Sequence, residues 1–366
     1  MMVLERVLLS IAAAGMSIPA FCQGGAPLTV PIPDDPLEIV RGPIDFAPPA
    51  ERDAILKLLD RARSNYAVRK DGPGYHLKVS FTVDSGGATQ HDGAWEMEET
   101  YAPGKGLRWT AKTAAGYTAT QISHEKLSYR ESSGSAYPLR LHEARAALFG
   151  PIATPQYVDK DRIRIATATW KDVELTCVLL SGLSNTPMLT PGRQWEESED
   201  CIDPQSGRLM LHSLAPGRYE LYDYTGAPTV GGHTLPHSVT ITEGGKTITE
   251  LRVDSFTELP DVDAALFVPT MAESEPGITL GQAHKISVLH KPGHIASNST
   301  IHPVCIFGLI NPAGQVVEAH SLQPADPNSP AAVEAAMRMN FHGAVATGGR
   351  PEQRFVFIVE KFVSTP

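Results

Sequence analysis

The stretch YHLKVSFTV at residues 75–83 decides the fold of this chain. In it, large apolar side chains alternate with polar ones without a miss. This period of two gives a β-strand with one apolar face and one face toward water. Shorter runs of the same kind, separated by turn residues, follow through much of the sequence. They predict an antiparallel sheet that grows outward from this strand.

Two amphipathic segments are predicted to be helices that cover this sheet. The first is PAERDAILKLLDRARSNY at residues 49–66, and the second is SAYPLRLHEARAALFGP at residues 135–151, which Gly150 and Pro151 should end. Two helices leave room for an apolar hollow on a curved sheet, although filling side chains could equally close it. The candidate wall residues, which could equally be core, are Trp95, Trp109, Tyr117 and Tyr129.

Size and charge limit the classes of function. The chain has 366 residues, more than one typical core requires, so two domains are expected. Its formal net charge is -10, and it has no basic stripe. Nucleic acid is therefore not expected among its partners.

The N-terminus has the character of a secretory signal. Arg6 precedes an apolar run at residues 7–21, with small residues at Ala20 and Cys22. The pattern predicts a signal peptide at residues 1–22 with cleavage after Cys22, although Cys22 could instead bear a lipid. No later apolar run is long enough to cross a bilayer. We therefore expect a periplasmic or secreted protein without a transmembrane segment, which begins with a proline-rich linker at residues 23–48.

Three cysteines follow the predicted cleavage site. Cys177 lies in the strand-like DVELTCVLL and Cys201 in EESEDCID. In an oxidising compartment, neighbouring strands could bring this pair within bonding distance, and two independent free cysteines are the alternative. Cys305, in VCIFGLI, is expected to be a buried thiol.

Residues 49–269 resemble a known family. A helix leads into a long antiparallel meander, which is followed by IDPQSGRL, GRYELYDYTGAPTVGGHTLPHSVTITEGGKTITELRVDSFTEL and DAALFVP. This order is similar to that of the lipoprotein carrier LolA and its relatives. The resemblance implies an incomplete antiparallel barrel capped by helices, with a cavity that takes acyl chains. A lipid or another apolar molecule is therefore a candidate ligand.

Residues 284–366, after a linker at residues 270–283, are predicted to form a second unit. A hairpin around NPAGQVVEAHSLQP precedes the helix SPAAVEAAMRMNF and a last strand, EQRFVFIVEKFV. This order resembles the C-terminal domain of TonB. The resemblance implies contact with an envelope protein through a sheet edge, which the last strand, expected to be unpaired, would offer. The expected fold class is α+β: a curved antiparallel half-barrel sheet capped by helices, then a small two-layer βαβ-type TonB-like domain.

Two clusters of polar residues could bind a metal ion or could simply be exposed to solvent. Four histidines could ligate zinc, but their spacing fits no metal motif and surface histidines are favoured: His284, His290, His294 and His302. Five acidic residues could hold calcium, but a solvated acidic loop is favoured: Glu196, Glu197, Glu199, Asp200 and Asp203. No metal site is therefore predicted.

No signature of catalysis or of a cofactor is found in the sequence. The nucleophile elbow, the P-loop and the dinucleotide fingerprint are all missing. We expect an exported, non-enzymatic binding protein of the cell envelope, without catalytic residues or cofactors. A periplasmic carrier of lipid or lipoprotein acyl chains is the alternative, and an unrecognised metallohydrolase is the remote one.

Overall fold

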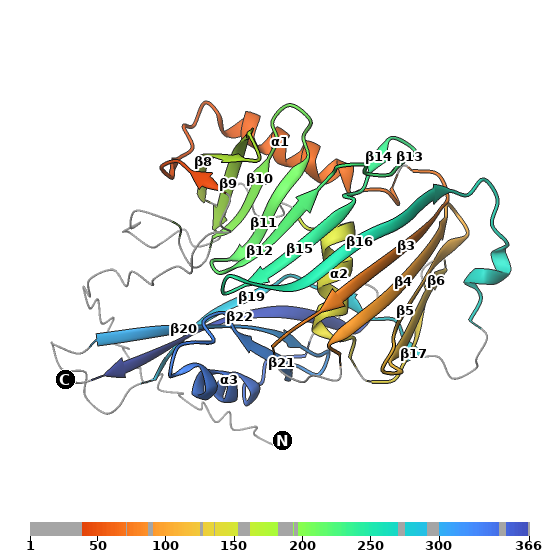
Figure 1. Cartoon of the computed structure of the whole chain (residues 1–366). Helices are drawn as coiled ribbons and strands as arrows, with labels where there is room; N and C mark the ends of the chain where they lie inside the picture. The colour runs from red at the N-terminus through yellow and green to blue at the C-terminus, as the bar shows by residue number, and fades with distance from the viewer. Residues whose placement is uncertain are drawn as a thin grey trace, which may run out of the picture.

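The structure is a computed structural model, and it describes residues 39–70, 72–86, 91–124, 127–134, 136–152, 162–181, 193, 197–269, 275–290, 300–343 and 349–364 (Figure 1). The predicted signal peptide and residues 23–38 of the predicted linker lie outside this part. Among the described residues, no helix combines the length and the apolar character that crossing a bilayer requires.

A curled antiparallel sheet of 15 strands forms the larger part of the fold (Figure 1). Strand β3 (Tyr75–Val83), predicted from its alternation, lies inside this sheet between β16 and β4, and all its large apolar side chains are buried. The other strands are β1 (Val40–Arg41), β2 (Asp45–Phe46), β4 (Gly93–Ala102), β5 (Gly106–Thr113), β6 (Thr118–His124), β7 (Leu127–Ser132), β8 (Arg162–Trp170), β9 (Val173–Ser181), β10 (Ser198–Ile202), β11 (Leu209–Ala215), β12 (Arg218–Asp223), β15 (Ser238–Glu243), β16 (Lys246–Glu258) and β17 (Glu275–Pro276). A separate small ribbon pairs β13 (Thr229–Val230) with β14 (His233–Thr234).

The end of the predicted proline-rich linker belongs to this sheet. Strands β1 and β2 both pair with β8, and Ile39 and Ile44 pack against a buried cluster on the outer side of β8 to β12. Residues 39–46 are therefore a structural part of the sheet. The composition of the segment did not indicate these two brief strands.

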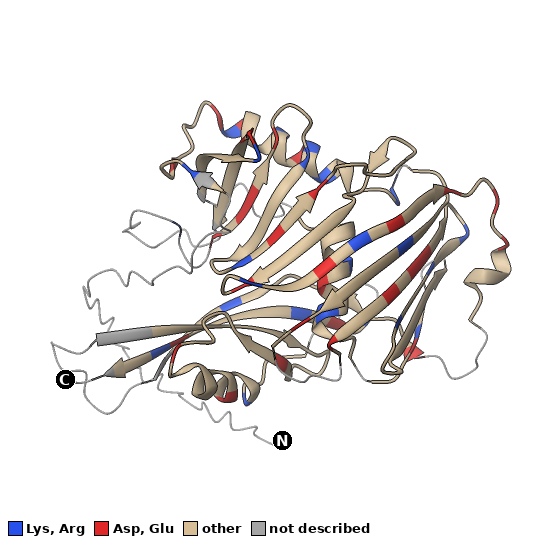
Figure 2. Ribbon diagram, viewed as in Figure 1, with Lys and Arg blue, Asp and Glu red and all other residues tan. Residues whose placement is uncertain are grey.

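Helices α1 (Arg52–Asn65) and α2 (Leu139–Phe149) pack on the concave face of the sheet, and α2 ends at Gly150 as predicted. Their buried side chains share one core cluster with the inward residues of β3 to β5. The opposite face of β3, β4 and β5 meets water. There, lysines and glutamates pair across strands (Figure 2), as Lys112 does with Glu96 at 2.8 Å.

A second sheet of five strands follows: β18 (Thr279–Leu280), β19 (His284–His290), β20 (Thr300–Ile310), β21 (Val316–Ser321) and β22 (Glu352–Ser364). The hairpin β20–β21, the helix α3 (Ser329–Met337) and the last strand β22 occur in the predicted order. The expectation that the last strand is unpaired was wrong. Strand β22 pairs with β20 on one side and with β18 and β19 on the other, and its apolar run at residues 355–359 is buried on both faces of the sheet.

The two sheets share a packed core. One face of the C-terminal sheet packs on α3, and the other packs on α2 and the β11–β12 turn, through Phe307, Phe355, Leu139 and Ala215 among others. Cys305 is a buried free thiol in this second layer. Side chains of the C-terminal sheet also hold the start of α2, since Glu318 accepts a hydrogen bond from the backbone N–H of Leu139 at 2.9 Å.

Candidate functional site

A cleft of about 410 Å³ lies between the curled sheet and the C-terminal sheet. Its volume falls in the range of small-molecule sites. The two helices end at this cleft: Tyr66 and Ala67 follow α1, and Phe149 and Gly150 end α2. The cleft thus depends on parts of the chain that are far apart in sequence and that only the packing of both sheets brings together.

Most of the cleft wall is apolar. From the first sheet and its helices come Ala146, Phe149, Ile152 and Leu214, and from the second come Leu280, Ala283 and Phe355. The described lining contains no serine, threonine or cysteine. Such a wall suits burial of an apolar group better than nucleophilic chemistry.

The polar end of the cleft is made by adjacent residues on three neighbouring strands. Asp200 of β10 lies opposite His212 of β11, which lies opposite Glu220 of β12. The Nδ1 atom of His212 is 2.7 Å from Oδ1 of Asp200, so the carboxylate orients the ring and leaves Nε2 as the ring nitrogen for a ligand. His212 and Glu220 both line the cleft.

Glu220 is held as a carboxylate. Burial acts to raise its pKa, but the charge of Arg218, followed by that of His212, and a hydrogen bond from Tyr222 outweigh burial, so the pKa lies below its ordinary value. Arg218 donates to Glu220 at 2.9 Å, and the Tyr222 hydroxyl donates at 2.7 Å. A negative charge therefore stays at the polar end of the cleft at neutral pH.

Behind Glu220 lies a buried ionic network that joins α2 to the sheet. Arg218 donates to Glu143 of α2 at 2.5 Å, and Arg140 of α2 makes two hydrogen bonds to Glu243 of β15, at 2.6 and 2.9 Å. The guanidinium carbon of Arg218 also lies 4.7 Å from the centre of the Phe307 ring in the C-terminal sheet. This network fixes α2, β12 and β15 around the cleft.

The four predicted wall residues do not line this cleft. Trp95 stacks on Phe81, and Trp109 lies beneath the guanidinium of Arg145, and both are buried in the core. Tyr117, which is half-buried, contacts Trp95, and Tyr129 is a half-buried residue of β7 opposite Ile122. The sequence left open whether Trp95 and Trp109 line a cavity or belong to the core, and in the structure both belong to the core.

Three residues of the acidic cluster are not in a solvated loop, which corrects the favoured interpretation for them, while Asp203 lies in the turn after β10. Glu197, Glu199 and Asp200 are buried at the start of β10, and each pairs with a basic side chain: Arg164 with Glu197, Arg41 and Arg193 with Glu199, and His212 with Asp200. Glu196 lies outside the described residues. Arg41 and Arg164 are remote in sequence from their partners, so charge composition alone could not identify these pairs.

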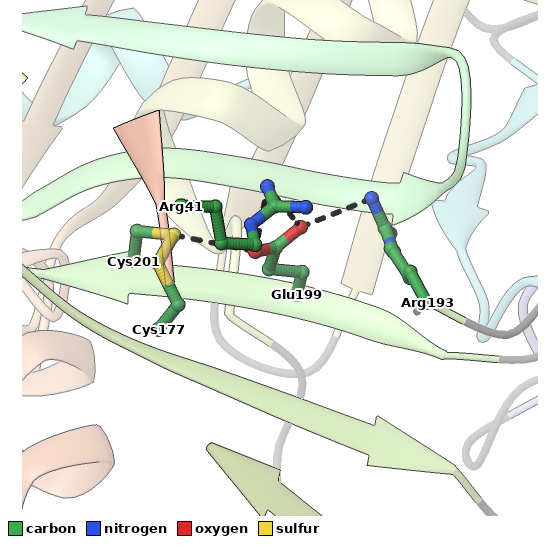
Figure 3. The surroundings of a disulfide bond; sticks show 5 residues. All are labelled: Arg41, Cys177, Arg193, Glu199 and Cys201. Atoms are coloured by element: carbon green, nitrogen blue, oxygen red, sulfur yellow. Dashed lines mark hydrogen bonds and ion pairs between the residues drawn. A yellow bond between two sulfur atoms is a disulfide. The ribbon is translucent and has the colours of Figure 1, made fainter. Parts of the chain in front are cut away.

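Cys177 and Cys201 form a disulfide between the directly opposed positions of β9 and β10 (Figure 3). Glu199 lies beside it between Arg41 and Arg193 (Figure 3). The two sulfurs and a Glu199 oxygen lie within 4.8 Å of one another, a distance at which three such atoms could hold a metal ion. Here the two sulfurs are bonded to each other in the disulfide. Of the four histidines, His284 hydrogen-bonds Arg354 at 2.7 Å, and residues 291–299, which include His294, lie outside the described part.

No family model and no curated protein matches this sequence. Solved structures do. A LolA superfamily protein from Nitrosomonas europaea matches 58% of this chain and 97% of its own, with 9% identity and a TM-score of 0.35. An outer membrane lipoprotein-sorting protein domain from Vibrio parahaemolyticus matches 58% and 96%, with 10% identity and a TM-score of 0.35. MucB in the MucA/MucB complex of Pseudomonas aeruginosa matches 71% of this chain and 81% of that one, with 11% identity and a TM-score of 0.28.

Proposed function

We propose that this chain is a non-enzymatic, exported binding protein that holds the apolar part of an amphipathic molecule in the cleft. The observation that carries the proposal is the cleft itself: an apolar wall drawn from both sheets, with the buried polar residues His212 and Glu220 in its lining and Asp200 behind His212. The disulfide supports an oxidising compartment. The dimensions suit an alkyl or acyl chain, whose burial is favourable by about 0.8 kcal/mol for each CH₂ group.

A saturation experiment with an uncharged apolar probe tests this proposal. The fluorophore N-phenyl-1-naphthylamine should bind the full chain with a stoichiometry of one and gain fluorescence on binding. Ala146 lines the cleft, so Ala146→Trp should fill the cleft and weaken binding by at least about 10-fold. Ala331→Trp makes the same change at an exposed position of α3 and should leave binding unchanged.

Two outcomes of this experiment would contradict the proposal. An unaltered chain that does not bind the probe, or an Ala146→Trp variant that binds it as well as the control, would reject the cleft as a binding site. Mass spectrometry of the gently purified protein is a second readout. A co-purified lipid should be present in the unaltered chain and absent from Ala146→Trp.

A second candidate function is contact with an envelope protein through strand β19. Within the described part of the chain, β19 pairs with β22 alone, so its other edge carries main-chain groups that can accept a partner strand. This edge takes the role that the sequence assigned to the last strand. This proposal includes the resemblance of residues 284–366 to the C-terminal domain of TonB.

Site-specific photo-crosslinking tests the edge. A photoreactive side chain at the exposed Ser287 of β19 should give a discrete adduct when the full chain is illuminated in an envelope extract. The same group at the exposed Ala331 of α3 is the control and should give none. Identical products at the two positions, or no adduct at Ser287, would remove this candidate.

A further inference from the structure

The groups that face a ligand at the polar end of the cleft are acceptors of hydrogen bonds. Glu220 is a carboxylate that lines the cleft, and one hydrogen bond to each of its oxygens leaves further acceptor capacity. His212 gives its Nδ1 side to Asp200, so in the neutral ring Nε2 accepts. A headgroup that sits against Glu220 and the neutral ring of His212 must therefore donate.

The formal charge at this end is negative in either protonation state of His212. A protonated His212 would only balance Asp200. In the network behind them, Arg140 and Arg218 face three glutamates, Glu143, Glu220 and Glu243, which leaves one negative charge in excess.

The nearby arginines do not cancel this charge at the site. Arg63 of α1 lines the cleft; its terminal nitrogen pairs with Asp60 at 2.5 Å, and its Nε atom is buried with no hydrogen-bond partner among the described residues. Arg69 and Arg145 pair with Glu99 and lie over the ring of Phe149, and neither lines the cleft. Arg69 and Arg145 are therefore held by other partners, and next to His212 the charged group that lines the cleft is the carboxylate of Glu220.

Both helix ends at the cleft have the same sign. Tyr66 is the C-terminal cap of α1 and Gly150 is that of α2, and both residues line the cleft. The C-terminus of a helix carries about half a negative charge from its aligned peptide dipoles and presents unpaired carbonyl groups. Two such ends at one cleft favour a cation over an anion.

We propose that the ligand of this cleft is an amphiphile with a cationic headgroup that donates hydrogen bonds, of the class of a long-chain primary ammonium ion. Its chain lies along Leu214, Leu280 and Phe355, and its headgroup lies at His212 and Glu220. At His212 and Glu220, carboxylate, sulfate and phosphate headgroups would meet the like charge of Glu220. This inference rests on the proposed function, because it requires that the cleft bind an amphiphile.

Calorimetric titration of the full chain with three ligands of equal chain length tests the headgroup. Dodecylammonium, dodecyl sulfate and dodecyl maltoside are compared at pH 7 below their micelle concentrations. Dodecylammonium should bind at least about 10-fold more tightly than dodecyl sulfate, since charge-assisted hydrogen bonds form only with the former. If all three bind equally, or the sulfate binds best, the headgroup inference fails while the proposed function stands. If none binds, the proposed function itself fails.

A charge-removing variant assigns the preference to Glu220. Glu220→Gln should lower the affinity for dodecylammonium by about 10-fold and leave that for dodecyl maltoside unchanged. Glu250→Gln removes the same charge from an exposed position of β16 and should change neither affinity. Should Glu220→Gln lose its fold by circular dichroism, the unaltered chain is titrated at low and high ionic strength instead: salt should lower its affinity for dodecylammonium relative to dodecyl maltoside, and a ratio that does not depend on salt would count against the inference. An unchanged ratio of the two affinities in the folded variant would overturn the inference.

Discussion

The Glu318 carboxyl shows how a single residue can make this fold sensitive to pH. It sits on β21 and accepts the backbone N–H of Leu139 at the start of α2. Burial raises its pKa from the ordinary 4.5 to about 7, although the hydrogen bond from Leu139 and the charge of Arg140 act in the opposite direction. The folded chain thus holds this proton up to about pH 7, whereas the unfolded chain releases it near pH 4.5.

The stability contributed by Glu318 is therefore fully present below pH 4.5 and declines as the pH rises to about 7. Glu318→Gln keeps an acceptor for Leu139 and cannot ionise. We expect this substitution to raise the free energy of unfolding at pH 8 by roughly 1 to 2 kcal/mol and to change it little at pH 5. The increase is smaller than the full pKa shift implies, because the side chain is only half-buried. Urea denaturation at both pH values measures the difference.

The control for this prediction is Glu334→Gln. Glu334 is an exposed residue of α3 that pairs with Arg338, so its substitution should have a small effect at both pH values. An equal effect of Glu318→Gln at pH 5 and pH 8 would contradict the raised pKa of the Glu318 carboxyl group.

At the scale of elements, α2 is the part that joins the two sheets. Its polar side chains reach β12 and β15 through Arg218 and Glu243, while its first residue, Leu139, packs in the core that the C-terminal sheet shares. A buried ion pair is only a weak source of net stability, but removal of one partner leaves charges buried without compensation. The position of α2 is thus sensitive to the loss of any one member of the network.

Arg218→Ala should destabilise the protein by about 3 to 5 kcal/mol, because Glu143 and Glu220 would lose their partner in a buried environment. Arg252→Ala is the matched control, since Arg252 is an exposed residue of β16 that pairs with Asp254, and it should cost less than about 1 kcal/mol. Denaturant unfolding followed by circular dichroism provides both values. Equal effects of the two substitutions would contradict the proposed importance of the network.

At the scale of the whole molecule, the two sheets should unfold together. Their interface contains buried side chains from α2, the β11–β12 turn and the C-terminal sheet, and Phe307 contacts the Arg218 network. Separate unfolding would expose this apolar surface and the buried charges at the same time. We therefore expect one cooperative transition.

Two probes check this prediction during urea denaturation. Tryptophan fluorescence follows the first sheet, where Trp95 and Trp109 are buried, and hydrogen exchange of β20 and β22 amides follows the second. The two midpoints should coincide. A C-terminal sheet that loses protection at a distinctly lower urea concentration would show that the units are energetically independent.

The sequence by itself determined the local elements of this protein. Alternation fixed β3 and its neighbours, and the helices at residues 52–65 and 139–149 followed from apolar stripes and from Gly150, because these patterns act over a few residues. Cys177 and Cys201 were a candidate pair because neighbouring strands could bring them together in an oxidising compartment, and in the structure they form a disulfide.

Only the tertiary structure decided which polar groups meet and where a hollow remains. Asp200, His212 and Glu220 become neighbours through strand register, and the cleft needs Tyr66, Phe149 and Phe355 from distant parts of the chain. Register and packing between sheets depend on long-range contacts that no short pattern encodes. For that reason the sequence left open whether Trp95 and Trp109 line a cavity or belong to the core, and the fold places both in the core.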